Sequence, residues 1–213
     1  MPEPKIWKDR ARLIQNLKAK WPRYASRVHA QAEWEQVIRG AISGNTFRAF
    51  RNMPAAPSAV FREWATNALL DRKALAKVRN ISSIRQYDRW FNKLVLDLQI
   101  VWSNNMGTGM SFGPSYKLPN LLLKAVSEKL LAESGKDIRP FLHVAWDKYT
   151  LIGLRNVVTW PDGKRITLSS TMKSVDTEEA YNHLLQEIRA IAAEADVPAI
   201  AYDYLAWDES HRG

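Results

Sequence analysis

The sequence predicts a mainly α-helical protein, and two observations support this class. Apolar residues recur at helical spacing along most of the 213 residues. The stretches between them contain Gly, Pro or Asn, which favour loops. Only residues 156–169 depart from the helical period. We therefore predict one unit over residues 1–213, with two helical lobes around a basic cleft and one small β-hairpin.

Four amphipathic helices are predicted in the first half of the chain, at residues 6–21, 28–43, 59–70 and 82–103. Ser58 precedes the third helix, and its hydroxyl is expected to cap the helix start by accepting a backbone hydrogen bond. A Gly-containing connection, 104–111, follows the fourth helix. We expect this connection to be flexible.

The second half of the chain predicts further helices after two charged residues. A helix is expected over Leu118–Leu131, with Lys117 at its entrance, and another apolar segment starts at Asp147. Residues 176–195 begin with Asp-Thr-Glu-Glu, which resembles a capping box. A last helix is expected from about Pro198.

The predicted β-hairpin occupies residues 156–169. Two short β-branched and apolar runs, 157–160 and 165–168, flank the segment Pro161-Asp-Gly-Lys164. Glycine adopts the positive φ that a tight turn needs, so this segment favours a hairpin turn.

Composition limits the class of protein. The chain is 46% hydrophobic and 25% charged, which is typical of a globular protein with a sizeable core. The absence of Cys excludes disulfides, thiolate zinc sites and Cys-ligated iron–sulfur clusters, and we expect no metal or cofactor. No apolar run is long enough for a membrane span and no signal core is visible, so a cytoplasmic protein without a membrane partner is expected.

The charge is strongly positive and unevenly distributed. The net charge is +9, and residues 1–103 carry 19 basic and 8 acidic residues, against 12 and 14 in the remainder. A basic half is suited to a polyanion, because neutralising phosphates releases condensed counterions. The charge therefore favours nucleic-acid binding, although basic side chains can also serve solubility alone.

Lys117 and Asp147 carry the chemistry that the sequence indicates. An amine is nucleophilic only when neutral, and partial burial or a helix N-terminus both favour the neutral form. A carboxylate in a partly dry cleft can stabilise a cationic transition state or act as a base. The alternatives are a solvated surface lysine and an aspartate that only caps its helix.

Three motifs, in order along the chain, resemble those of the helix-hairpin-helix DNA glycosylase superfamily. Ser43-Gly-Asn45-Thr46 ends an apolar helix and is similar to the family's Ser-x-Gln-Thr. Gly113-Pro-Ser-Tyr-Lys117-Leu-Pro-Asn looks like the hairpin Gly-x-Gly-x-Lys-x-Ala-Asn. His143-Val-Ala-Trp-Asp147 looks like the segment that supplies the catalytic aspartate. The spacing between Lys117 and Asp147 is closest to that of the archaeal 8-oxoguanine glycosylase branch.

This resemblance implies roles for particular residues. Lys117 would attack the sugar C1′ and form a Schiff base, and Asp147 would assist loss of the base. The residues implied for the base pocket are Asn45, Asp203 and Trp207, the last two spaced i, i+4 on the final helix. The residues expected at the DNA backbone are Gly113, Ser115, Arg48 and Arg51. The region 104–155 would thus carry both catalytic groups.

The chain also departs from the family pattern. Ser115 replaces the second hairpin glycine, Pro114 and Pro119 are unusual there, and Asn45 stands where the family has Gln. These differences leave the excised base open: an oxidised purine such as 8-oxoguanine, an alkylated base or a bulkier hypermodified base. The predicted partner is double-stranded DNA with a modified base, bound by a nucleoid-associated monomer.

Two alternatives to an enzyme remain open. The first is a non-catalytic DNA-binding module with the same fold, which the altered hairpin motif favours. The second is a helical protein-interaction adaptor that would bind a peptide through its Trp-rich surface. The adaptor would show only weak, salt-sensitive DNA binding, because scattered charges alone would act.

Overall fold

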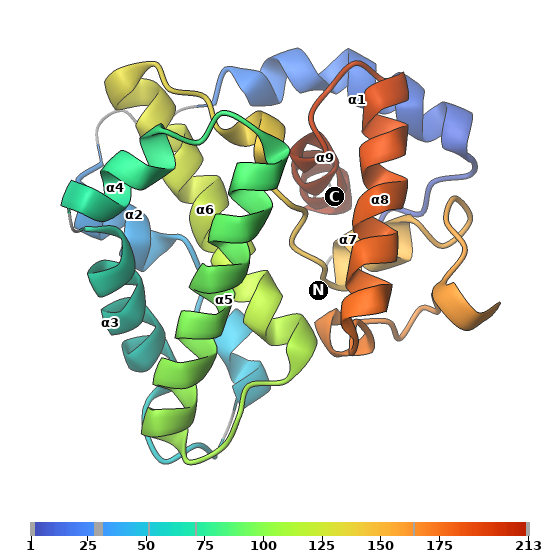
Figure 1. Cartoon of the computed structure of the whole chain (residues 1–213). Coiled ribbons are helices and arrows are strands. Elements are labelled where there is room, and N and C mark those ends of the chain that lie inside the picture. Colours follow the sequence, from blue (N-terminus) through green and yellow to red (C-terminus); the bar gives the residue numbers. More distant parts are fainter. Residues whose placement is uncertain (1–2, 28–31, 51, 71, 164, 212–213) are drawn as a thin grey trace. The chain divides into compact units, whose positions relative to one another are not determined.

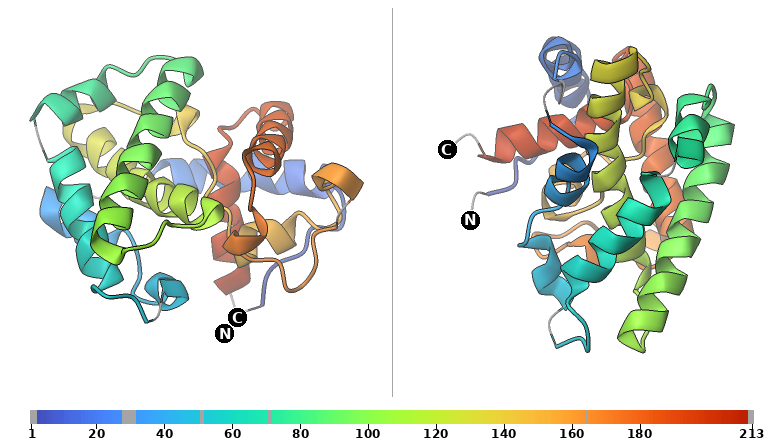
Figure 2. Two further views of the ribbon diagram at one scale, coloured as in Figure 1. Left: turned by 60° about the horizontal axis from the view of Figure 1, so that its bottom comes forward. Right: turned by 90° about the vertical axis from the view of Figure 1, so that its left-hand side faces the viewer.

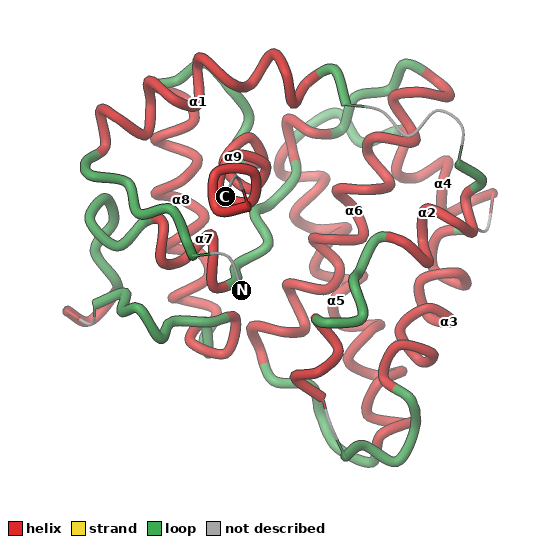
Figure 3. Tube along the Cα trace, turned by 180° about the vertical axis from the view of Figure 1, so that it is seen from behind, coloured by secondary structure: helices red, strands yellow, loops and turns green. Residues whose placement is uncertain are grey.

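The mainly α-helical class is confirmed. The computed structural model describes residues 3–27, 32–50, 52–70, 72–163 and 165–211. Within these ranges the chain forms nine α-helices and four short 3-10 helices, and no strand (Figures 1 and 3). None of the helices in the described part of the chain combines the length and hydropathy needed to cross a bilayer.

The chain divides into two compact units that alternate along the sequence. Unit 1 comprises residues 1–27, 111–117 and 142–213, and unit 2 comprises residues 28–110 and 118–141. The division falls within one helix, α6 (Phe112–Ser134), after Lys117. Lys117, Asp147, Asp203 and Trp207 therefore all belong to unit 1.

Unit 1 is built around α9 (Ile200–His211). This helix contacts α1 (Arg10–Ala25), α7 (Lys148–Gly153) and α8 (Glu178–Glu194), as the views in Figures 1 and 2 show. Its buried residues lie on all sides of the helix: Ile200, Ala201, Tyr202, Asp203, Tyr204, Leu205, Ala206 and Ser210. A helix buried around its whole circumference belongs to the core, so α9 is the element against which the others of unit 1 are positioned.

Basic side chains of α1 and of the segment after it pair with acidic side chains of α8 and α9. The ion pairs join Arg10 to Glu194, Lys20 to Glu209, and Arg27 to Asp208. Part of the positive charge of the first half of the sequence is thus neutralised by the acidic second half. These cations stabilise unit 1, and they weaken the argument that all of the N-terminal charge serves a polyanion.

Unit 2 contains the long helix α5 (Ile84–Met106). Ser83 caps its start by accepting from the backbone N–H of Gln86, and Gly107 ends it in the left-handed conformation with φ +66°. α3 (Pro57–Leu69) contacts α5, as Figure 2 shows. The other elements of unit 2 are α2 (Trp34–Gly40), α4 (Arg72–Arg79), η1 (Thr46–Phe50) and η2 (Arg139–Phe141).

The start of α6 differs from the predicted turn. The residues Gly113 to Lys117 lie inside the helix, so Lys117 is beyond the first turn instead of at the entrance. Gly-Pro signals a turn in a sequence, but Pro114 falls in the first turn, where its missing N–H would have no intrahelical partner. Pro119, further along, cannot donate to the carbonyl of Ser115, yet the helix continues past it.

The predicted hairpin at 156–169 is not confirmed. The described residues of this range form no strand; a 3-10 turn, η3 (Pro161–Gly163), stands where the hairpin turn was expected. Backbone groups that would form a ladder are used elsewhere: the carbonyl of Thr159 bonds the His183 ring, and the N–H of Thr167 bonds the hydroxyl of Ser170. Local sequence patterns do not reveal such side-chain partners.

Two smaller expectations also change. Ala56, not Ser58, occupies the N-cap position of α3, because Pro57 already serves as its first residue. The short helix α4 was not predicted, since its sequence is dominated by basic residues. Within residues 28–43, the described helix is α2, and 28–31 lie outside the described residues.

Glycine is required at position 113 because the backbone of Met172 approaches it closely. This contact leads to a first prediction. A Cβ built on Gly113 would lie 1.8 Å from the carbonyl oxygen of Met172, which belongs to η4 (Met172–Ser174). We expect Gly113→Ala to lower the free energy of unfolding by about 1–3 kcal/mol, the usual cost of inserting atoms into a packed site. Urea denaturation measures this change. Gly109→Ala is the matched control, because a Cβ there meets no atom within 4 Å, and an equal loss for both variants would contradict the prediction.

Candidate functional site

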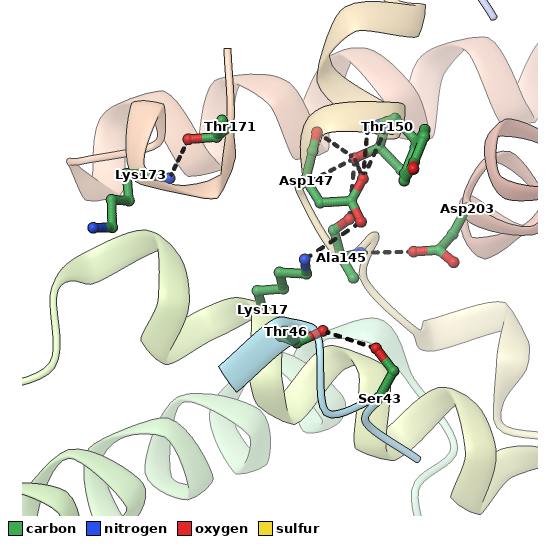
Figure 4. Close-up of polar contacts among 10 residues, drawn as sticks. Ser43, Thr46, Lys117, Ala145, Asp147, Thr150, Thr171, Lys173 and Asp203 are labelled. Carbon is green, nitrogen blue, oxygen red and sulfur yellow. Dashed lines mark hydrogen bonds and ion pairs between the residues drawn. The ribbon is translucent and has the colours of Figure 1, made fainter. Parts of the chain in front are cut away.

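Lys117 and Asp147 form an ion pair within unit 1. The Nζ atom of Lys117 lies 3.4 Å from Oδ2 of Asp147, and Figure 4 shows the lysine side chain pointing toward the carboxylate. Only 9% of the Lys117 residue surface is exposed. The structure therefore brings together the two residues that the sequence selected 30 positions apart, with an amine and a carboxylate that are both largely shielded from water.

The other oxygen of Asp147 caps α7. Oδ1 accepts hydrogen bonds from the backbone N–H groups of Tyr149 and Thr150, at 2.8 and 3.2 Å. In return, the hydroxyl of Thr150 accepts from the backbone N–H of Asp147 at 2.8 Å, which completes a capping box. An aspartate that only caps its helix was one alternative for Asp147 at the level of sequence. The structure shows that its carboxylate both caps α7 and pairs with Lys117, with one oxygen for each.

Two neighbouring residues of α9 hold the segments on either side of Asp147. Oδ2 of Asp203 accepts from the backbone N–H of Ala145 at 3.0 Å, before Asp147, and the Tyr202 hydroxyl donates to the carbonyl of Thr150 at 2.6 Å, after it. Burial, together with the charges of Asp147 and Asp203, raises the pKa of Tyr202 well above its usual value, so its hydroxyl remains a donor. Sequence reasoning missed this bracing role. A hydrogen bond that Asp203 would accept from the edge of a flipped base stays a prediction.

Trp207 belongs to an aromatic cluster next to Asp147. The Trp207 residue is 48% exposed, its ring stacks on His211 with centroids 3.8 Å apart, and it meets the Tyr149 ring in a T-shaped contact with centroids 5.5 Å apart. Burial, and then the charge of Asp147, raise the pKa of Tyr149, which keeps its hydroxyl protonated at neutral pH. The sequence selected Trp207 for stacking on a base. Tyr149 and His211 were not selected, although their spacing from Asp147 and Trp207 was a signal that could have found them.

The predicted backbone-contacting pair, Gly113 and Ser115, lies in a buried part of α6. Gly113 faces the carbonyl of Met172, as described above, and Ser115 is fully buried. The N–H of Ser115 donates to Ser111, and its hydroxyl donates to the carbonyl of Phe112 at 2.7 Å. The backbone N–H and the hydroxyl of Ser115 thus bond to residues near the start of α6, and a contact of Gly113 or Ser115 with DNA phosphate stays a prediction.

The remaining predicted residues belong to unit 2. Asn45 is exposed in the turn before η1, and Arg48 is exposed within η1. Arg51 lies outside the described residues. A joint site with Lys117 therefore stays a prediction for Asn45, Arg48 and Arg51.

The arrangement in unit 1 supports a definite kind of chemistry. A primary amine beside a carboxylate can lose its proton to that carboxylate and then attack an electrophilic carbon. The carboxylate can equally stabilise a positive charge that develops on a substrate. The exposed Trp207 indole, which contacts the Tyr149 ring two residues after Asp147, offers a flat surface to a planar ring.

Comparisons with protein-family models, with curated proteins and with solved structures give no match for this chain. The function assigned to the site therefore depends on its geometry and on the resemblance of its motifs.

The burial of the Lys117–Asp147 pair predicts a measurable coupling. In a double-mutant cycle with Lys117→Met and Asp147→Asn, we expect a coupling free energy of roughly 1–3 kcal/mol, because removing one partner leaves a shielded charge unpaired. Asn retains the helix cap, so the cycle isolates the ion pair. Urea denaturation of the four proteins measures the coupling.

An exposed pair of the same chain is the control for this cycle. Arg39 and Glu35 are 2.7 Å apart on α2, with more than half of each side chain exposed. We expect Arg39→Met and Glu35→Gln to show a coupling of only about 0.3–0.5 kcal/mol. Equal couplings for the two pairs would mean that the Lys117–Asp147 pair is effectively solvated.

Proposed function

We propose that this protein is a DNA N-glycosylase with an associated abasic-site lyase activity, acting on a modified base that is flipped out of duplex DNA. The observation that supports the proposal is the shielded pair of Lys117 and Asp147, 3.4 Å apart in one unit. An amine and a carboxylate at this distance can act together in displacing a base from a sugar, the amine as nucleophile and the carboxylate as proton acceptor. The motifs around both residues resemble those of the helix-hairpin-helix glycosylases.

Asp147 has two tasks in this mechanism. Its Oδ2 lies 3.4 Å from the Lys117 amine, so it can accept a proton and generate the neutral amine. As the N-glycosidic bond breaks, the base leaves with the bonding electron pair and positive charge develops at the sugar, which the carboxylate stabilises. The cap on Oδ1 and the bracing from α9 hold this group in place.

Lys117 forms the covalent intermediate. Its Nζ bonds to C1′, the ring oxygen leaves C1′ and takes up a proton, and the nitrogen loses its remaining spare proton to give an iminium ion. Abstraction of a C2′ proton then breaks the 3′ C–O bond by β-elimination, and water releases the enzyme. No metal or organic cofactor enters any of these steps.

The aromatic cluster around Trp207 is suited to the flipped base. The exposed indole provides a stacking surface, and stacking contributes about 1–3 kcal/mol per base in proteins that bind unstacked nucleotides. Stacking does not distinguish one planar base from another. The proposed substrate class is therefore a modified base. Its members to test are an oxidised purine, an alkylated base and a bulkier modified base.

Borohydride trapping tests the proposal directly. We expect the wild-type protein, incubated with an abasic-site duplex and borohydride, to form a covalent adduct, because hydride reduces the iminium to a stable secondary amine. Lys117→Ala should abolish the adduct, whereas Lys124→Ala, on the same helix, should retain it. Denaturing gel electrophoresis measures the adduct, and a panel of duplexes with modified bases then ranks the substrates.

Asp147→Asn tests base excision separately from the lyase activity, on the duplexes with modified bases. We expect release of free base to fall by about 10²-fold or more, the usual contribution of a positioned acid–base group. Full base release and trapping in Lys117→Ala would overturn the mechanism. Salt-dependent duplex binding with neither base release nor an adduct would instead identify a non-catalytic DNA-binding module, and very weak binding would favour the protein-interaction adaptor.

A further inference from the structure

Unit 2 contains a groove between α3 and α5, two helices that pack against each other (Figure 3). The groove has a volume of about 380 Å³, and small-molecule sites in proteins have volumes of about 300–1,000 Å³. Its lining residues recur at helical spacing, so each helix contributes one face. They include Asp97, Val101 and Asn105 on α5, and Val60, Glu63 and Trp64 on α3.

The charged residues that line the groove are both acidic. Glu63 lies on α3 and Asp97 on α5, and both residues are exposed. Among the described residues, no basic residue lines the groove, and neither carboxylate forms an ion pair. The whole chain carries a net charge of +9, so an acidic groove is opposite in sign to the protein around it. Two unpaired carboxylates in one groove favour a cationic ligand.

Trp64 holds one of these carboxylates in a fixed orientation. Its indole N–H donates to Oδ2 of Asp97 at 2.9 Å, and the Trp64 residue is only 2% exposed. The bond leaves Oδ1 of Asp97 for a ligand. A guanidinium binds a carboxylate best through two parallel bonds to both oxygens, whereas an ammonium group needs a single acceptor. The arrangement at Asp97 therefore favours an ammonium group.

Asn105 offers a second acceptor on α5. Its amide nitrogen donates to the backbone carbonyl of Val101 at 2.8 Å, which leaves its side-chain carbonyl oxygen for a ligand. Asp97 and Asn105 are two steps of four residues apart, which is about 12 Å along a helix axis. Val101 lies midway between them, and Val60 adds an aliphatic side chain from α3. Separated acceptors with a hydrocarbon surface between them match amines that are joined by alkyl spacers.

We propose that the groove between α3 and α5 binds a linear aliphatic polyamine. Its protonated amines donate to the oxygens of Glu63, Asp97 and Asn105. Its methylene groups lie against Val60 and Val101, where they lose contact with water. The groove belongs to unit 2 and the ion pair of the candidate site belongs to unit 1, so this inference does not rest on the proposed function.

Isothermal titration calorimetry with spermidine tests the proposal on the full chain without DNA. We expect the wild-type protein to bind a single spermidine. Glu63→Gln and Asp97→Asn should each weaken binding by about fivefold, the upper end of what a partly exposed charge pair contributes. The uncharged chain 1,8-octanediol should not bind, because it lacks the ammonium groups.

The controls separate the groove from the general charge and from folding. Glu35→Gln removes the same charge from an exposed residue of α2 outside the groove, and it should bind spermidine like the wild type. Asp97→Asn retains an acceptor for the indole of Trp64. Glu63→Gln breaks no hydrogen bond or ion pair within the described residues, so its effect reports on the ligand even if Asp97→Asn lowers stability.

Three results would overturn the polyamine site. The first is the absence of spermidine binding to the wild-type protein. The second is an equal loss of binding in Glu35→Gln, which would mean that spermidine responds only to diffuse charge. The third is tighter binding of a capped peptide with two lysines than of spermidine, with the same dependence on Glu63, which would assign the groove to lysine side chains of a partner protein. Borohydride trapping by Lys117 is independent of all three.

Discussion

The carboxylate of Asp147 is the group on which the rest of the site depends. One oxygen begins α7 and the other faces the amine of Lys117, so a single side chain joins local helix formation to the chemistry of unit 1. Its position is in turn set by α9, which binds the backbone before and after it. Residues 200–206 of α9 are buried on all sides and cannot shift without disturbing the core, and this gives the ion pair a rigid support.

The helical class and several helix starts followed from the sequence because their causes are local. Ser83 caps α5, Thr177 caps α8 and Asp147 caps α7. Each of these caps is followed by apolar residues at helical spacing, which is visible in the sequence. Lys117 and Asp147 were selected from their surroundings and a family resemblance, and the structure brings them within 3.4 Å. Predictions from local sequence were wrong where the same residues occur in two kinds of structure. Gly-Pro at 113–114 indicated a turn, but the same pair is compatible with the first turn of a helix.

The rest of the site depends on contacts between distant residues, which no local pattern encodes. Asp203 binds a backbone N–H 58 positions away, and the hydrogen bond from His183 to Thr159 replaces a strand partner in the predicted hairpin. The ion pairs of Arg10, Lys20 and Arg27 also join distant parts of the sequence. Their acidic partners on α8 and α9 lie near the other end of the chain, so the first half of the sequence looked more available to a polyanion than it is. Charge counted along a sequence therefore overstates the charge that remains for a ligand.

The distribution of cations bears on how unit 1 would meet DNA. Arg10, Lys20 and Arg27 pair with acidic side chains of α8 and α9, whereas Arg165 and Lys173 are exposed within residues 163–175, which contain no acidic residue. A phosphate backbone would thus be attracted to residues 165–173, and the carbonyl of Met172 in that segment lies against Gly113 of the helix that carries Lys117. The close backbone contact at Gly113 therefore holds an exposed cationic segment against the helix of the proposed nucleophile. In the proposed mechanism, the shielded amine of Lys117 would keep its carboxylate partner, Asp147, until a sugar carbon is offered to it.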